Sequence, residues 1–580
     1  MKFVNVKSIY LLTVVVVTTF TAAGLIFITQ VNYETLISGL VAIVNKPGVE
    51  NILRAKALPA DKFSLIKQLC YAGLLLLIFA AWFLIKFRDS ILGLLKLVWR
   101  SIYDSYKSVL NVYRSYSKKQ NIILLLLLLV IICKSLYYIN SWDLQYDEMW
   151  CYNYYTAQPF YFSFFMYSNY PLYEIITNLF EWMPFSMKVN LRLPVLLMGL
   201  AACILLHACL KKYLKNDKAA LAGTVLFAFM PVTTFYMLYA RGVIFELFFA
   251  IAALFSLLFW LKNERTQNKY LVIYIISNVL GIYSMPTHIY YWLLLCLISV
   301  SVCFFKYKQE RKKIILANLL VVLLAAICYL PVFAGSGFSF VENAVSDKIN
   351  MWDAFQSSWG IAAGISIFFT GFGFSIVVAI VIYLILLSLK QNKKYQLLII
   401  FCISLCILPV SAYIVQGFYI TERAWAFAGL AIPLATSLLF ITINKYLQSA
   451  IAYVIICAAG TGAAVISDQH TFLNWSREQD KQTIEIAGLF MKNKIGSCYD
   501  KSTGSGFFYY YPGIEFYYKR ENESISIAMA AANSMRYVPF NASDNYDCIV
   551  YKLNDTVSVN NYKEIYRDAE HDFKIMMRDK

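Results

Sequence analysis

Long runs of apolar residues recur along most of the chain, separated by short polar or basic segments. Most runs hold about 20 residues, the length that an α-helix needs to cross the hydrocarbon core of a bilayer. The pattern therefore predicts an α-helical polytopic membrane protein with about 13 transmembrane helices. The expected spans are residues 8–29, 69–87, 121–139, 189–210, 219–238, 243–261, 271–284, 287–305, 314–333, 361–389, 397–415, 424–443 and 447–466.

Composition and charge agree with this class and add an orientation. Hydrophobic residues make up 60% of the chain and charged residues 15%, which excludes a soluble globular protein. The formal net charge is +17, and the Lys and Arg residues gather in alternate connections. The positive-inside rule places those connections in the cytoplasm, so the basic balance calls for no nucleic-acid partner. The basic connections are residues 211–218, 262–269, 306–313, 390–394 and 444–445.

Residues 1–120 are predicted to form an N-terminal part that contains the first two spans. Residues 86–119 follow the second span, are rich in Lys and Arg, and carry apolar residues at helical spacing. Such spacing predicts an amphipathic helix. Its basic charge predicts that this helix lies on the anionic inner leaflet and faces the cytoplasm. The next span, residues 121–139, then runs outward.

An acidic loop follows this outward span, and Asp143, Asp147 and Glu148 lie in it. Carboxylates in a half-dry site at the membrane surface can accept protons, because burial and neighbouring cations adjust their pKa. A solvated loop that merely ends a helix is the alternative. The rest of the first outer loop, residues 140–188, is rich in Tyr and Phe and broken by prolines, which favours short helices at the membrane interface.

The composition becomes polar after residue 466, and residues 467–580 are predicted to form a small α/β domain outside the cytoplasm. Its cysteines, Cys498 and Cys548, lie on the predicted outer side, where we expect them to form a disulfide. The strand-like runs are residues 506–511, 514–518 and 547–551, and the helical stretch is residues 479–491.

Several short motifs resemble, in their order and sidedness, those of the membrane-embedded GT-C glycosyltransferases of family 39, the protein-mannosyltransferase and aminoarabinose-transferase group. The resemblance covers about residues 121–446, within an expected transmembrane core of residues 121–466. Two positions depart from the family: Asn169 stands where a His is frequent, and Gly242 follows Arg241 where an aromatic pattern is usual. The motifs are Asp147-Glu148, residues 167–173, residues 191–194, residues 239–241, and residues 421–423 before a span that contains Pro433.

The resemblance implies transfer of a sugar from a polyprenyl-phosphate donor to an acceptor hydroxyl at the outer membrane face, with inversion. Asp147 matches the family's general base and Glu148 its adjacent acid. An arginine at the end of a span costs free energy unless it is paired or functional. Three arginines are therefore candidates for binding the donor phosphate. The alternative is that such a side chain only snorkels to the membrane interface. They are Arg241, Arg423 and Arg192, and the expected substrate-cavity residues are Tyr146, Tyr170, Tyr173, Glu246 and His288.

The sequence identifies the cofactor and the partners only by their chemical class. Glu148 and His288 could bind a divalent metal cation, although a lone histidine is more often only hydrogen-bonded. The expected partners are the lipid-linked donor, a protein, lipid or glycan acceptor, and membrane lipids, in a bacterial inner membrane with the C-terminal domain outside. Two other functions stay open: a non-catalytic transporter, flippase or polysaccharide-export subunit, and a ligase or polymerase that uses a diphosphate-linked oligosaccharide.

Overall fold

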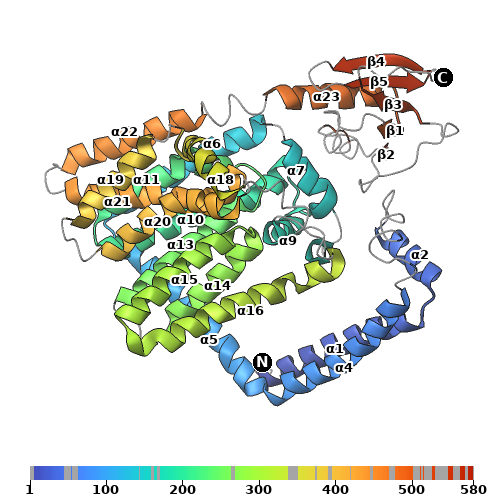
Figure 1. Cartoon of the computed structure of the whole chain (residues 1–580), viewed down its shortest axis with the longest axis horizontal. Coiled ribbons are helices and arrows are strands. Elements are labelled where there is room, and N and C mark those ends of the chain that lie inside the picture. The colour runs from blue at the N-terminus through green and yellow to red at the C-terminus, as the bar shows by residue number, and fades with distance from the viewer. Residues whose placement is uncertain are drawn as a thin grey trace. The chain divides into compact units, whose positions relative to one another are not determined.

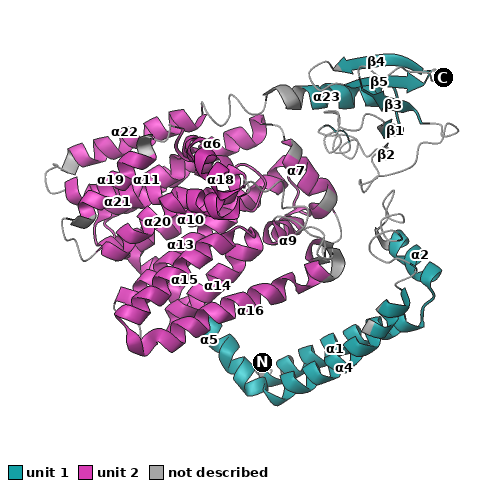
Figure 2. Cartoon of the chain, in the orientation of Figure 1, with its two compact units in different colours: residues 1–99, 482–580 teal, residues 100–481 magenta. Residues whose placement is uncertain are grey.

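The computed structural model of the chain resolves into two compact units, which Figure 2 distinguishes by colour. One unit comprises residues 1–99 and 482–580, and the other comprises residues 100–481. The structure describes residues 6–44, 54, 60, 63–142, 144–157, 162–165, 170–262, 268–336, 350–371, 375–389, 395–417, 420–443, 449–468, 477–500, 510, 514, 526–529, 546–552, 562–568 and 573–578.

The N-terminal helices are α1 (Val6–Gln30), α2 (Tyr33–Val44) and α4 (Phe63–Lys86). The longer two, α1 and α4, pack against each other. The Tyr10 hydroxyl donates to the Leu84 carbonyl at 3.1 Å, and Lys7 pairs with Asp89 at 2.9 Å. Their other faces expose large apolar side chains such as that of Phe20, as expected for helices that face lipid.

The second unit is a helical body, which Figure 1 shows from α6 to α22. At its centre α13 packs against α10 and α14, and α11 packs against α10, α21 and α22. Helix α5 (Arg88–Arg114) belongs to the first unit up to Trp99 and to the second unit from Arg100 onward. The other elements of the second unit are α6 (Lys118–Ser141), α7 (Tyr146–Cys151), η3 (Tyr152–Thr156), α8 (Phe162–Phe165), α9 (Pro171–Phe180), α10 (Met187–Leu214), α11 (Asp217–Phe229), α12 (Pro231–Tyr236), α13 (Val243–Lys262), α14 (Asn268–Ser284), α15 (His288–Phe305), η4 (Lys308–Glu310), α16 (Arg311–Ser336), α18 (Met351–Thr370), α19 (Ser375–Leu389), α20 (Gln396–Gln416), η5 (Glu422–Leu430), α21 (Ala431–Ile443) and α22 (Ser449–Ser467).

Nine helices in the described ranges are long and apolar enough to cross a membrane. They lie in α1, α4, α6, α10, α13 and α15, in α16 with η4, in α20, and in α21 with η5. Two shorter apolar helices cover Val377–Leu387 and Ile451–Ser467. The chain is therefore a multi-pass helical membrane protein, which confirms the expected class. The aromatic stretch after the acidic loop folds into short helices, as its prolines indicate.

Two segments that were expected to be single spans, residues 219–238 and 361–389, are each divided into two helices. Met230 has an extended backbone (φ −67°, ψ 149°) and precedes Pro231, which begins α12; the proline ring disfavours the helical conformation of the residue before it. Gly371 ends α18 with φ 72°, the left-handed conformation that glycine adopts without strain. The expectation of one continuous helix was wrong in both places.

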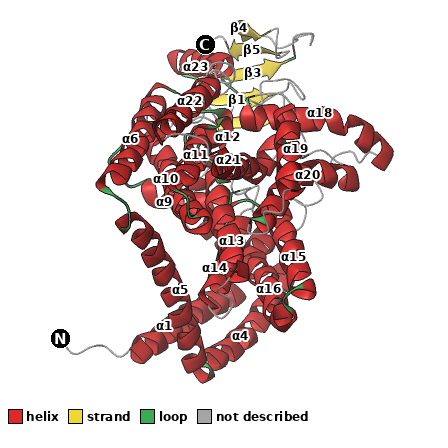
Figure 3. Cartoon of the chain, turned by 90° about the vertical axis from the view of Figure 1, so that its left-hand side faces the viewer, coloured by secondary structure: helices red, strands yellow, loops and turns green. Residues whose placement is uncertain are grey.

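The C-terminal region forms a five-stranded mixed sheet with strand order β2-β1-β3-β5-β4. Strands β2, β1 and β3 are parallel, and β5 is antiparallel to β3 and β4. All the strands of the described residues lie in this sheet (Figure 3), so the expected small α/β domain is confirmed. The elements are α23 (Arg477–Lys492), β1 (Ser497–Asp500), β2 (Ser526–Met529), β3 (Cys548–Tyr551), β4 (Tyr562–Asp568) and β5 (Phe573–Arg578).

The expected strand at residues 547–551 matches β3, and the expected helix at residues 479–491 matches α23. The other two expected strands lie outside the described residues, apart from Tyr510 and Ile514. Cys498 and Cys548 stand opposite each other in the β1–β3 register, fully buried. Both are free thiols, so the expected disulfide is absent from this structure.

Candidate active site

The acidic loop turns directly into a short helix that contains both candidate acids. After α6, Trp142 has an extended backbone (φ −105°, ψ 124°), and α7 then begins at Tyr146. The backbone N–H of Gln145 donates to Glu148 Oε2 at 2.8 Å, which fixes the first turn of α7. Asp147 and Glu148 are neighbours on a helix, so their side chains diverge by about 100° and reach different partners.

Glu148 is fully buried and paired with Arg192, which is also fully buried. Arg192 Nε donates to Glu148 Oε1 at 2.9 Å, and Arg192 Nη2 donates to Oε2 at 2.6 Å. The backbone N–H of Ala240 donates to Oε1 at 2.8 Å, and Arg192 Nη1 donates to the Trp142 carbonyl at 2.7 Å. This bidentate pair joins the acidic loop to α10 and to the turn before α13. A buried pair of this kind is costly to break on one side only.

Asp147 points the other way and meets both of the remaining candidate arginines. Its Oδ1 lies 2.7 Å from Arg241 Nη2, and its Oδ2 lies 2.9 Å from Arg423 Nη1. The side chain of Asp147 is 26% exposed and that of Arg423 is 39% exposed, whereas the side chain of Arg241 is 6% exposed. The structure thus brings Asp147, Arg241 and Arg423 into one partly open cluster, although Arg423 is 276 residues from Asp147 in the chain.

Tyr239 completes the Asp147 cluster, and the sequence alone did not single it out. Its hydroxyl donates to Asp147 Oδ2 at 3.1 Å. Burial raises the pKa of Tyr239 well above its ordinary value, and the Asp147 carboxylate raises this pKa further. The hydroxyl therefore keeps its proton and remains a donor. The available signal was its position in the Tyr239-Ala-Arg241 motif, two residues before an arginine already selected.

The turn that contains Arg241 is packed against Tyr170. The Arg241 guanidinium carbon lies 5.0 Å from the centroid of the buried Tyr170 ring, in reach of a cation–π attraction. A Cβ atom on Gly242 would lie 2.7 Å from the Ser284 carbonyl oxygen and 2.9 Å from the Tyr170 ring. Glycine at position 242 therefore permits the close approach that positions Arg241.

Another expected cavity tyrosine, Tyr173, makes its hydrogen bond away from this cluster. Tyr173 is fully buried on α9, and its hydroxyl donates to the Leu191 carbonyl at 3.1 Å. Its contact therefore links α9 to α10, one residue from Arg192. Tyr146 begins α7, but its side chain lies outside the described part of the chain, as does all of Asp143.

Glu246 and His288 form a separate buried pair between α13 and α15. Both side chains are fully buried, and His288 Nδ1 lies 3.6 Å from Glu246 Oε1. No polar atom of either side chain has a hydrogen-bond partner among the described residues. The His288 ring fills the space beside Gly281, where a Cβ atom would lie 2.4 Å from His288 Nε2. This pair is not hydrogen-bonded to the Asp147 cluster.

The residues considered for a metal ion are not assembled around one point. Both Glu148 oxygens accept hydrogen bonds from Arg192 and from backbone N–H groups, and His288 pairs with Glu246. Within the described ranges no group of three or more His, Cys, Asp and Glu side chains could hold a metal ion. Three protein ligands are the usual minimum for a tightly bound transition metal, and the described residues bring no such set together.

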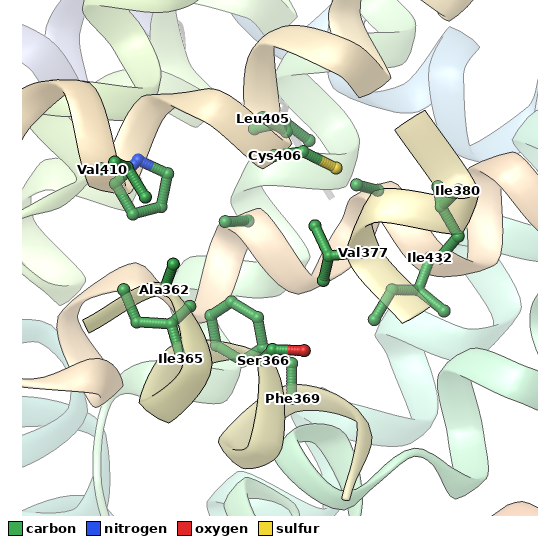
Figure 4. Close-up of a pocket in the computed structure, with 13 residues that line it drawn as sticks. Ala362, Ile365, Ser366, Phe369, Val377, Ile380, Leu405, Cys406, Val410 and Ile432 are labelled. Atoms are coloured by element: carbon green, nitrogen blue, oxygen red, sulfur yellow. The ribbon is translucent and has the colours of Figure 1, made fainter. Parts of the chain in front are cut away.

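An apolar pocket lies further along η5, the element that begins beside Arg423. It lies between α18, α19, α20, η5 and α21. Figure 4 shows Phe369, Leu405 and Ile432 among the side chains that line it. Ala428 of η5 is also in its wall, five residues after Arg423. The backbone of η5 is kinked at Trp425, between Arg423 and the pocket wall.

Comparison with solved structures places this fold among known ones. The chain is similar to ArnT from Cupriavidus metallidurans bound to undecaprenyl phosphate, with a TM-score of 0.54 and 10% sequence identity over 80% of this chain and 98% of that chain. It therefore has the GT-C-like fold expected from its motifs. Weaker matches are ArnT from the same organism in the apo state (TM-score 0.49, 10% identity, 70% and 87% coverage) and the archaeal oligosaccharyltransferase AglB from Archaeoglobus fulgidus with an inhibitory peptide and a dolichol-phosphate (TM-score 0.42, 14% identity, 65% and 59% coverage). No protein-family model and no curated protein sequence matches the chain.

Proposed function

We propose that the chain is an integral-membrane glycosyltransferase that moves a sugar from a polyprenyl-phosphate donor to an acceptor hydroxyl. The observation that supports this proposal best is the Asp147 cluster, in which a partly exposed carboxylate lies between two guanidinium groups. A carboxylate suits removal of the hydroxyl proton, and guanidinium groups suit binding of the phosphate that leaves. The GT-C-like fold adds support, because the neighbouring ArnT structure is described as bound to undecaprenyl phosphate.

In this proposal Arg241 and Arg423 bind the donor phosphate. The cluster contains two guanidinium groups and one carboxylate, so one formal positive charge is left over for an anionic ligand. As the bond to the sugar breaks, negative charge grows on the phosphate, and two fixed cations at the site stabilise that charge. The stacking of Arg241 on Tyr170 holds one of these cations in place before the donor arrives.

Asp147 is the proposed general base. In the structure Arg241, Arg423 and Tyr239 contact its two oxygens. The donor phosphate competes for the same guanidinium groups, so its binding frees lone pairs of Asp147 for the acceptor hydroxyl. The carboxylate accepts that proton while the hydroxyl oxygen attacks the sugar carbon from the side opposite the phosphate, which inverts the configuration.

Glu148 and Arg192 take a positioning role instead of the catalytic and phosphate-binding roles expected from the sequence. Both side chains form hydrogen bonds within the buried network. This network fixes α7, which holds Asp147, against the turn that holds Arg241. Tyr173 supports the same arrangement through α9 and α10, and Glu246 and His288 brace α13 against α15 behind the site.

The apolar pocket is the proposed place for part of the donor's isoprenoid chain. Arg423 and Ala428 are five residues apart in the chain, and η5 is kinked between them at Trp425. The pocket wall therefore follows closely, in sequence, the arginine proposed to bind the phosphate. We place the protein in a bacterial inner membrane, with the site and the C-terminal sheet at the outer face.

The proposal is tested in a strain that lacks the chain and receives the wild type, D147N or D104N. Asp104 is an exposed carboxylate of α5 and serves as the matched control. Mass spectrometry of lipid extracts should show a polyprenyl-phosphate sugar that accumulates in the deletion strain and with D147N, but not with D104N. Normal lipid profiles with D147N, at wild-type protein levels, would contradict a catalytic role for Asp147 and leave the transporter as the better function. Accumulation of a diphosphate-linked oligosaccharide would favour the ligase.

A further inference from the structure

Helix α5 joins two membrane spans and is itself not one of them. Span α4 ends at Lys86, α5 covers Arg88–Arg114, and the next span begins at Lys118. Because the chain does not cross the membrane between these spans, both ends of α5 meet the same membrane face. At 1.5 Å per residue the helix is about 40 Å long. Such a helix, fixed at both ends to one face, lies along that surface.

One face of α5 exposes a row of large apolar side chains. Leu95, Trp99, Ile102 and Tyr106 follow one another at intervals of four, three and four residues, so they share one side of the helix. Their side chains are 53%, 69%, 43% and 59% exposed. A row of exposed apolar groups of this length is unusual for a surface in water.

A row of cations runs beside the apolar row. Lys96, Arg100, Lys107 and Arg114 are each exposed, and all four share one side of the helix. Lys96, Arg100 and Lys107 directly follow members of the apolar row, about 100° around the helix. In the described ranges none of the four forms an ion pair with a carboxylate, although other basic residues such as Lys7 and Lys211 do. Their charges are therefore available to an anionic partner.

Contacts with α10 hold the C-terminal end of α5. The Tyr113 hydroxyl donates to the Ile204 carbonyl at 2.7 Å, and Lys212 Nζ donates to Ser108 Oγ at 3.4 Å. Ser101 is almost fully buried. Tyr113 lies seven residues after Tyr106, on the side of the apolar row, so the end of this row packs against α10 and the exposed part runs from Leu95 to Tyr106.

We propose that α5 binds the anionic headgroup layer of the bilayer, with the apolar row inserted among the acyl chains and the basic row at the lipid phosphates. Both features fit this partner: the apolar row gains from burial at the headgroup boundary, and the basic row gains from the negative surface potential. A neutral bilayer would satisfy only the first feature. This interaction is separate from the proposed sugar transfer, because no residue of the Asp147 cluster takes part.

Hydrogen exchange of the full chain tests this proposal. The protein is placed in nanodiscs of phosphatidylcholine alone or with phosphatidylglycerol, and exchange of peptides from residues 88–114 is followed by mass spectrometry. The test variant is K96Q/R100Q/K107Q. The matched control is K306Q/K308Q/K312Q, which removes three exposed cations from another basic connection. The thermal unfolding midpoint of each variant in detergent establishes that it is folded.

Phosphatidylglycerol should slow exchange of α5 in the wild type and in the control, and high salt should remove this protection. Each basic side chain near an anionic surface is expected to shift the docking equilibrium by about fivefold, so three shift it on the order of 100-fold. The test variant should therefore exchange alike in both lipids. Equal exchange of wild-type α5 in the two lipids, or equal loss of protection in the test and control variants, would overturn the proposal. Strong protection in phosphatidylcholine alone would indicate packing against protein instead.

Discussion

Replacing Asp147 by Asn is expected to strengthen donor binding while it abolishes transfer. In the structure Asp147 occupies both arginines that the donor phosphate would use, at 2.7 and 2.9 Å. The phosphate must displace at least one of these contacts when it binds. Asparagine keeps the shape of the side chain but has no charge, so it competes less with the phosphate.

The size of the effect follows from the exposure of the pair. A hydrogen bond to a charged group contributes about 1.5–3 kcal/mol when buried, but Asp147 is 26% exposed and Arg423 is 39% exposed, so solvent screening reduces this value. A loss of about 1.4 kcal/mol for one displaced contact corresponds to a tenfold change in affinity. The Kd for undecaprenyl phosphate should therefore fall by about tenfold in D147N. Transfer should fall by at least about 100-fold, the usual contribution of a general base.

The assay is a titration of the full chain in nanodiscs with undecaprenyl phosphate, followed by isothermal calorimetry. R241Q should bind more weakly than the wild type, and D104N should match the wild type. High salt should narrow the difference between D147N and the wild type, because the competing contact is electrostatic. Equal or weaker binding by D147N would refute the idea that Asp147 and the phosphate compete for the same arginines.

Three further results are expected from the surroundings of the site. E148Q or R192Q alone should lower the unfolding free energy by about 3–5 kcal/mol, because each leaves a buried partner unpaired, and the double variant should recover part of the loss in thermal unfolding. G242A should reduce transfer about tenfold or more by pushing the turn off its neighbours, whereas G360A, which has nothing within 4 Å of its Cβ, should be neutral. Burial raises the pKa of the Cys151 thiol, so this cysteine should resist alkylation by N-ethylmaleimide at pH 8 in the folded protein and react once unfolded; modification at the rate of an exposed cysteine would contradict its placement.

The class of the protein and the identity of its central carboxylate could be predicted from the sequence. Apolar runs of span length identify a membrane helix whatever its neighbours are, and Asp147 stood out because three carboxylates follow one outward span in a basic protein. Arg241 and Arg423 could be proposed as site residues because a charged side chain at the end of a membrane span costs free energy unless it is paired or functional.

The partners of these residues could not be predicted, because a contact across many spans leaves no local signature. Arg192 and Arg423 look alike in sequence, yet one is fully buried on Glu148 and the other reaches Asp147. Which of two adjacent acids faces which arginine depends on the rotation of α7, which its own six residues do not determine. The helix breaks at Pro231 and Gly371 did have local signals, namely the proline and the glycine themselves. The prediction of one continuous span gave more weight to the long apolar runs, and this was wrong.

The buried Glu148–Arg192 pair also bears on how the protein enters the membrane during synthesis. Arg192 lies in the first turns of α10, and an arginine within a span opposes insertion by up to about 2.5–3.5 kcal/mol at the bilayer centre. Glu148 is made 44 residues earlier, so the acidic loop has already emerged when α10 arrives. The Glu148 carboxylate can then neutralise the charge of Arg192 as α10 inserts into the membrane. The pair would thus assist biogenesis first, and only afterwards hold the folded site together.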